Sequence, residues 1–221
     1  MSFLTGLLQD LSESLITLFV ILNPLGVIPF FQGLTAEATP QQKAAVARKT
    51  IMIAIVVLLV FAYLGDIILG ALHITLGSVM IAGGVFILVF AVKDIASTQA
   101  QTAAKSGKNG KALPTTVDDT IAVFPLAIPL LAGPGAIATV MVLNNPQYGA
   151  ATGWWDVSTA VAIVLDCVII WLLLSLSSKL MKVLKPSAMV ITAKVMDILM
   201  GAIGISFLIR GAVGIFGIQL P

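Results

Sequence analysis

Two short runs rich in proline and glycine could bind a small molecule through main-chain groups. The first, Asn23-Pro24-Leu25-Gly26, lies in the middle of the uncharged apolar stretch Ser14 to Gly33. The second, Gly133-Pro134-Gly135-Ala136, lies in the middle of a similar stretch, Ile121 to Leu143. Proline removes a main-chain N–H from a helix and glycine loosens what remains, so each run is predicted to divide a helix in two.

A divided helix offers charge without a charged side chain. The first half ends in free carbonyl groups with partial negative charge, and the second half begins with free N–H groups with partial positive charge. Two such junctions facing each other could hold the ammonium group and the carboxylate of a zwitterion. The glycines remove side-chain volume and the neighbouring residues are apolar. The chemistry predicted is therefore binding of a small, polar molecule that is neutral overall.

The predicted substrate-binding residues are Asn23, Pro24, Leu25, Gly26, Gly133, Pro134, Gly135 and Ala136. Among them Asn23 is the only strongly polar side chain, and in an apolar segment its amide needs a partner. Two further prolines, Pro29 and Pro129, would bend the half-helices. If the protein binds its ligand from one side of a membrane and releases it on the other, these prolines are predicted to act as hinges during this alternating access.

Asp166 is the candidate for coupling transport to an ion gradient. It lies near the centre of the apolar stretch Val157 to Ser178, where an ionised side chain costs about 2.5 to 3.5 kcal/mol on insertion scales. Its carboxyl group must be protonated, paired or in contact with water. A proton or ion relay and a structural hydrogen bond both fit this position, and the coupling ion could be a proton or another ion.

The composition requires elements that cross a membrane. Of the 221 residues, 59% are hydrophobic and 10% are charged, and the mean hydropathy is +1.09. These values exclude a soluble globular domain. The predicted fold is an all-α membrane protein with six transmembrane helices, of which the first and fourth are broken near the bilayer midplane. The predicted spans are Ser14 to Gly33, Val46 to Leu72, Ile74 to Val92, Ile121 to Leu143, Val157 to Ser178, and Val195 to Ile218.

The basic residues predict the orientation of these helices. Eleven of the twelve Lys and Arg residues follow the first, third and fifth spans. Because positive loops stay in the cytoplasm, we expect three basic cytoplasmic loops and both termini outside. The net charge of +2 thus reports orientation, and no nucleic-acid partner is expected. A single cysteine excludes an intramolecular disulfide and a cysteine metal site, and neither a metal nor a cofactor is expected.

The chain is predicted to consist of two halves of three spans, residues 1–96 and 119–221, joined by a polar cytoplasmic linker, residues 97–118. An odd number of spans per half makes the second half insert upside down, so the halves would be inverted-topology repeats. Each half begins with a broken span, has an acid in its second span (Asp66 or Asp166) and has glycines in its third.

Three motifs resemble those of the MarC family of inner-membrane proteins: Leu22 to Phe30 (LNPLGVIPF), Ile81 to Gly84 (IAGG) and Pro125 to Ile137 (PLAIPLLAGPGAI). The resemblance covers nearly the whole chain. It implies a six-span carrier in a prokaryotic inner (cytoplasmic) membrane, of the SnatA type that transports small neutral amino acids such as glycine and alanine, with export as one direction. The substrate would bind at the junctions in spans one and four.

The chain departs from this family's pattern at two places. Met80 stands where relatives tend to have an arginine, and Lys194-Val195-Met196-Asp197 stands where a basic residue is followed by Ile-Met-Gly.

Two alternatives to a carrier follow from the same residues. A passive channel for small neutral solutes would also use paired half-helices, although the second junction has no asparagine to match Asn23. An intramembrane aspartyl protease would need two aspartates at one depth, whereas Asp66 is predicted near the outer surface and Asp166 near the centre. We therefore expect a membrane carrier and not an enzyme, in contact with lipid and with a small zwitterionic amino acid.

Overall fold

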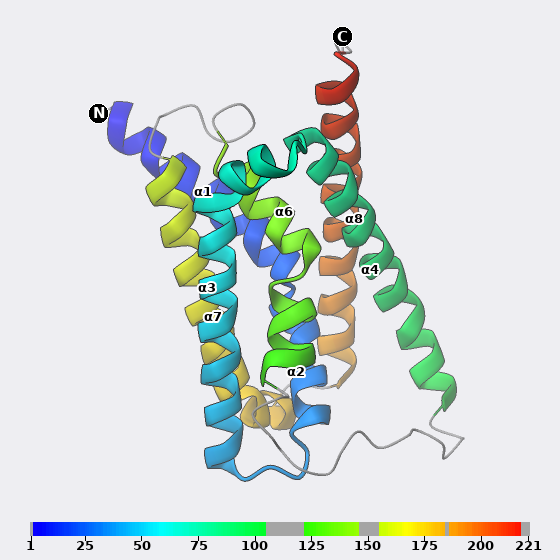
Figure 1. The fold of residues 1–221 in the computed structure, drawn as a ribbon. Helices are drawn as coiled ribbons and strands as arrows, with labels where there is room; N and C mark the ends of the chain where they lie inside the picture. The colour runs from blue at the N-terminus through cyan, green and yellow to red at the C-terminus, as the bar shows by residue number, and fades with distance from the viewer. Residues whose placement is uncertain (1, 105–121, 146–154, 184–185, 218–221) are drawn as a thin grey trace.

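The computed structural model describes residues 2–104, 122–145, 155–183 and 186–217, and within these ranges every regular element is a helix (Figure 1). The elements are α1 (Ser2–Leu22), α2 (Pro24–Leu34), α3 (Pro40–Leu72), α4 (Leu76–Ala104), the π-helix η1 (Ala122–Leu131), α6 (Pro134–Leu143), α7 (Trp155–Val183) and α8 (Pro186–Phe216). The predicted all-helical class is confirmed for this part of the chain.

Five helical segments of the described chain are long and apolar enough to cross a membrane. They are Thr5–Leu34, Pro40–Leu72, Leu76–Ile95, Val157–Leu180 and Ile191–Phe216. The first of them contains both α1 and α2. The remaining predicted span, Ile121 to Leu143, contains η1 and α6 instead of one long helix, and α6 is an apolar helix of only 10 residues.

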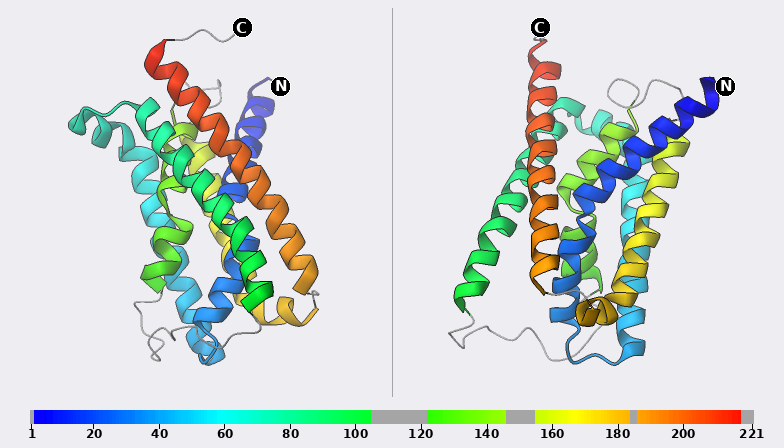
Figure 2. Two further views of the ribbon diagram at one scale, coloured as in Figure 1. Left: turned by 90° about the vertical axis from the view of Figure 1, so that its right-hand side faces the viewer. Right: turned by 180° about the vertical axis from the view of Figure 1, so that it is seen from behind.

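The helices run between two ends of the molecule. The start of α1 and the end of α8 lie at the upper end in Figure 1, where α3 also ends and α4 begins. The opposite end holds the end of α2, the start of α3, the ends of α4 and α7, and the start of α8, as the views in Figure 2 confirm. The described helices that flank the three basic connections therefore meet at one end.

The third spans of the two predicted halves, α4 and α8, lie side by side and antiparallel along one side of the molecule (Figure 2). A β-carbon at Gly84 would lie 2.7 Å from the main-chain oxygen of Gly204, and one at Gly211 would lie 2.7 Å from that of Gly77. Contacts this short leave no room for a side chain, so glycine is what allows the two backbones to touch.

On the other side, α7 packs against α1 and α3, and α6 packs against α3 and α4. The buried core surrounds the α1–α2 connection, where Leu18, Ile28 and Phe31 have no exposed surface. Large apolar side chains on the outside of α3 and α8, such as Ile67 and Ile191, are instead well exposed. An apolar exterior around a packed interior is expected of a protein that lies in lipid.

Two helix ends have specific causes. Thr39 and Gln42 form a reciprocal capping box at the start of α3, with Pro40 in the first position of the helix. At its other end α3 stops at His73, which adopts a left-handed conformation (φ 55°). Helix α4 continues beyond residue 96 to Ala104, into the segment predicted as a linker, and residues 105–121 lie outside the described chain.

Candidate functional site

The connection between α1 and α2, which we call the Asn23 junction, is a helix end followed directly by a helix start. Asn23 has φ 42° and ψ 60°, a left-handed conformation that asparagine tolerates better than most residues. Its side-chain oxygen accepts a hydrogen bond from the N–H of Gly26 at 3.2 Å, which makes Asn23 the N-cap of α2. Pro24 occupies the first position of α2, where its missing N–H costs nothing.

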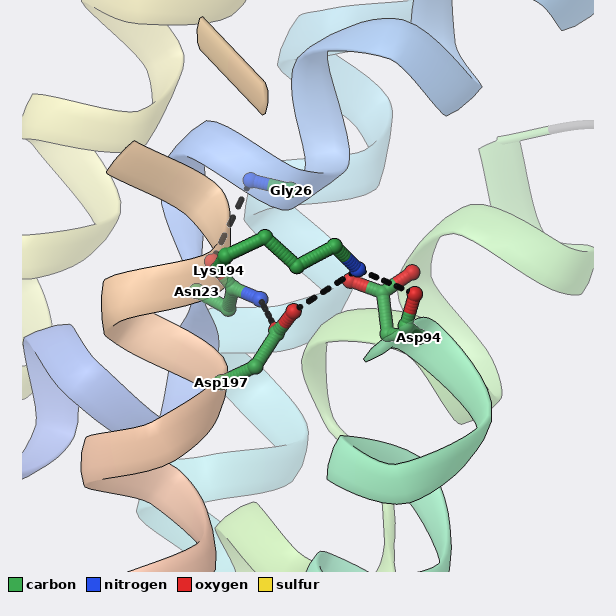
Figure 3. Close-up of polar contacts among 5 residues, drawn as sticks. All are labelled: Asn23, Gly26, Asp94, Lys194 and Asp197. Carbon is green, nitrogen blue, oxygen red and sulfur yellow. Dashed lines mark hydrogen bonds and ion pairs between the residues drawn. The ribbon is translucent and has the colours of Figure 1, made fainter. Parts of the chain in front are cut away.

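The side-chain amide of Asn23 also connects this junction to α8. Its Nδ2 donates to Oδ1 of Asp197 at 3.1 Å, between two side chains that are 3% and 0% exposed (Figure 3). A hydrogen bond to a carboxylate is stronger than one between neutral groups. Asn23 thus uses one end of its amide to shape the junction and the other to hold Asp197.

Asp197 belongs to what we call the charged cluster, which consists of Asp94 on α4 with Lys194 and Asp197 on α8. The ammonium group of Lys194 lies 3.4 Å from Oδ2 of Asp197 and donates to the main-chain oxygen of Asp94. The carboxyl group of Asp94 points towards that of Asp197 in Figure 3, and the two interact electrostatically. With both carboxyl groups ionised, the cluster has one negative charge in excess.

A narrow pocket lies beside the Asn23 junction. Its lining residues are Ile21, Leu22, Asn23, Gly26, Val27, Phe30, Phe90, Asp94 and Leu130. The space it offers to the centre of a water molecule is about 10 Å³, which is close to the least that one water needs. The lining side chains must therefore move before even a small amino acid can enter.

The first predicted run lies at or beside this pocket. Asn23 and Gly26 line it, Pro24 is buried and Leu25 is half-buried. A β-carbon at Gly26 would lie 2.7 Å from Nδ2 of Asn23, so glycine is required for the side chain of Asn23 to fold back over the start of α2.

The second run lies at what we call the Gly133 junction. It starts α6 as the first run starts α2, with an N-cap residue followed by proline. Gly133 is the N-cap and Pro134 the first helical residue, but no side chain of the described residues caps this end. The preceding η1 is a π-helix, and the N–H of Ala132 donates to the oxygen of Ala127 at 2.8 Å. Gly135 packs against Ile87 of α4, and Ala136 is buried. Of this region, Leu130 lines the pocket beside Asn23.

The two predicted hinge prolines lie inside helices. Pro29 is an exposed residue in the interior of α2, and the main chain at Pro129 lies within η1. Their role as hinges stays a prediction.

Asp166 lies in the middle of α7 and has no exposed surface, and neither of its carboxyl oxygens has a hydrogen-bond partner within the described chain. The hydroxyl of Thr159, two turns earlier on α7, also has no partner there. Asp66, by contrast, is exposed on α3. The two aspartates that a protease would need therefore lie in different environments.

Asp197 is the functional candidate that the sequence did not reveal. It lies near the end of the predicted span Val195 to Ile218, where charged side chains commonly reach solvent, whereas the structure buries it against Asn23. The one available signal was the unsatisfied amide of Asn23, which required a partner in a distant segment. Groups of three or more His, Cys, Asp or Glu side chains that could hold a metal are absent from the described residues.

The comparisons with known proteins agree with this picture of a helical membrane protein. A family model described as "MarC family integral membrane protein" matches residues 8–216. The chain therefore belongs to the MarC family.

Among its relatives is the UPF0056 membrane protein YhcE of Escherichia coli (strain K12), 33% identical over 205 residues that cover 91% of each chain. A UPF0056 membrane protein of Buchnera aphidicola is 30% identical over 206 residues, or 93% of this chain and 92% of the relative. The UPF0056 inner membrane protein YhgN of Escherichia coli (strain K12) is 32% identical over 141 residues, or 64% of this chain and 66% of the relative. No solved structure matches the chain.

Proposed function

We propose that this protein is a secondary transporter that moves small neutral amino acids of the glycine and alanine class across a prokaryotic inner membrane by alternating access. The observation that carries the proposal is the Asn23 junction. A helix end, a helix start and a buried polar side chain meet there beside a small, mostly apolar pocket. Irregular backbone at membrane depth is tolerated where it lines a cavity, and transporters use such interrupted helices to bind substrate.

The size of the pocket supports a small substrate. Its lining is aliphatic and aromatic apart from Asn23, Gly26 and Asp94, so it offers few polar groups and little volume. A carrier closes around its substrate and opens to one side at a time, which fits a pocket that is nearly filled in this conformation. A passive channel would need a continuous path, and it is the alternative that transport measurements must exclude.

The proposed architecture consists of two inverted repeats of three spans. In it, η1 and α6 together form the fourth span in chain order, in addition to the five long helical segments. The Asn-Pro and Gly-Pro pairs support this idea because each places an N-cap and then proline at the first helical position. The antiparallel contact of α4 with α8, the third spans of the two halves, also fits such a relation.

Asp166 is the proposed coupling residue. The described structure offers its carboxyl group neither a protein partner nor an exposed surface, and an unpaired buried charge is costly. A carboxyl group that carries a proton in this conformation and releases it in another would couple transport to a proton gradient. With the basic connections in the cytoplasm, both termini would lie outside.

The test is the flux of radiolabelled glycine and alanine in proteoliposomes, with and without an imposed pH gradient. Asn23→Gly is the most informative variant, because glycine tolerates the left-handed conformation but removes the amide. We expect saturable uptake by the parent protein and loss of most uptake in Asn23→Gly. Absence of saturable flux in folded, reconstituted protein would contradict the amino-acid assignment.

A further inference from the structure

The ammonium group of Lys194 occupies the acceptors beside the Asn23 junction. It contacts Oδ2 of Asp197 and donates to the main-chain oxygen of Asp94, and Asp94 also lines the pocket. A lysine ammonium group has the same three N–H donors as the amino group of a zwitterionic amino acid. The structure therefore contains a site for an ammonium group that is filled by a side chain of the protein.

We propose that Asp197, supported by Asn23, binds the ammonium group of the transported substrate, and that Lys194 is a tethered competitor that leaves when the substrate enters. This inference rests on the proposed transport function and replaces the idea that main-chain groups alone recognise the substrate. It makes Asp197 a substrate-binding residue and Lys194 a residue that sets affinity.

Burial and distance both favour this exchange. The side chain of Asp197 is 0% exposed whereas that of Lys194 is 23% exposed, so the lysine has a route outwards and the carboxylate has none. The separation of 3.4 Å between Nζ and Oδ2 exceeds the range of about 2.7 to 2.9 Å that is usual for a strong charge-assisted hydrogen bond. An incoming ammonium group could therefore approach Oδ2 more closely than Lys194 does, although it must also replace the hydrogen bond of Lys194 to the main-chain oxygen of Asp94.

Asn23 keeps Asp197 in place during the exchange. Its Nδ2 donates to Oδ1, whereas Lys194 contacts Oδ2, so the hydrogen bond from Asn23 can persist when the donor at Oδ2 changes. Departure of Lys194 would leave the carboxyl groups of Asp94 and Asp197 beside each other, and an incoming cation is favoured there by both. The carboxylate of an anion such as acetate is repelled.

Ligand protection against thermal unfolding tests the binding half of the proposal without transport. The full chain in detergent would be heated with methylammonium chloride, sodium acetate or glycine at matched ionic strength. We expect methylammonium and glycine to raise Tm and acetate to leave it unchanged. We also expect Asp197→Asn to remove both protections. Equal Tm values with methylammonium and acetate would overturn the proposal.

Lys194→Met tests the competitor, with Lys93→Gln as the matched control because Lys93 is an exposed lysine on α4. If Lys194 fills the site at least two thirds of the time, its removal should lower the apparent Kd for methylammonium at least about threefold. The control should leave the Kd unchanged. An unchanged or weaker affinity in Lys194→Met would show that Lys194 and Asp197 form only a structural ion pair.

The two proposals fail in different ways. Glycine flux that keeps its KM in both Asp197→Asn and Lys194→Met would overturn the ammonium site and leave the transporter assignment intact. Ammonium protection that depends on Asp197, without glycine flux in reconstituted protein, would support the site and contradict the assignment. Because Lys194→Met leaves the carboxylate of Asp197 in place, it keeps the test decisive even if Asp197→Asn does not fold.

Discussion

Replacement of Gly26 by alanine should break the contact between the Asn23 junction and α8. The new β-carbon would lie 2.7 Å from Nδ2 and 2.9 Å from Cγ of Asn23, which real carbon atoms do not approach. The side chain of Asn23 would have to turn away, and both of its hydrogen bonds depend on its present position. One bond reaches Asp197 and the other caps the N–H of Gly26 itself.

The size of the destabilisation by Gly26→Ala follows from the two hydrogen bonds that are lost and the helix propensity that is gained. The bond to a carboxylate contributes about 1.5 to 3 kcal/mol and the capping bond about 0.5 to 1.5 kcal/mol. Alanine is favoured over glycine in a helix by up to about 1 kcal/mol, which offsets part of this loss. We therefore expect Gly26→Ala to lower the free energy of unfolding by about 1 to 4 kcal/mol.

The assay is thermal or denaturant unfolding in detergent, with Gly33→Ala as the matched control. Gly33 lies on the same helix, and a β-carbon there would meet no atom of the described residues within 4 Å. The control should be neutral or slightly stabilising. A double-mutant cycle then isolates the cause, because in an Asn23→Gly background there is no side chain to displace. Gly26→Ala should cost nothing further in that background. Equal losses in both backgrounds, or equal stability of Gly26→Ala and Gly33→Ala, would refute the reasoning.

Three further predictions concern other parts of the molecule. Gly84→Ala should destabilise by about 1 to 3 kcal/mol, because its β-carbon would meet a main-chain oxygen of α8 at 2.7 Å; Gly201→Ala, with its nearest contact at 3.9 Å, should be tolerated in the same unfolding assay. Gly135→Ala should be destabilising through a 2.5 Å clash with Ile87, and Ile87→Ala should relieve part of that loss; an additive double mutant would contradict this contact. Asp166→Asn should remove the response of glycine flux to a pH gradient but keep glycine exchange, and an unchanged response would exclude Asp166 as the coupling residue.

The sequence predicted a divided helix at each of the two junctions. It treated Pro24 and Pro134 as prolines that interrupt a helix interior. The structure places each at the first position of a new helix, where proline is favourable. Because a cap and a proline are local signals, their positions could be predicted from the sequence alone.

The partner of Asn23 could not be predicted in the same way. The amide required a polar partner, but Asp197 is 174 residues further along the chain, and only the packing of α8 against the junction brings the two together. In the sequence, Lys194 to Asp197 stand out only as a departure from a family pattern. Residue spacing along one helix does not determine which neighbouring helix it faces. The place of Asp166 in the middle of a helix was predictable from its span, whereas the lack of a hydrogen-bond partner within the described chain depends on the helices around it.

Counterflow distinguishes a carrier that works at the Asn23 junction from a passive channel. Proteoliposomes loaded with unlabelled glycine would be diluted into labelled glycine, for the parent protein, Gly26→Ala and Gly33→Ala. We expect saturable labelled uptake that internal glycine accelerates in the parent and in Gly33→Ala, and loss of that uptake in Gly26→Ala. Flux that rises linearly with glycine concentration, without acceleration by internal glycine, would show a channel and contradict alternating access at the Asn23 junction.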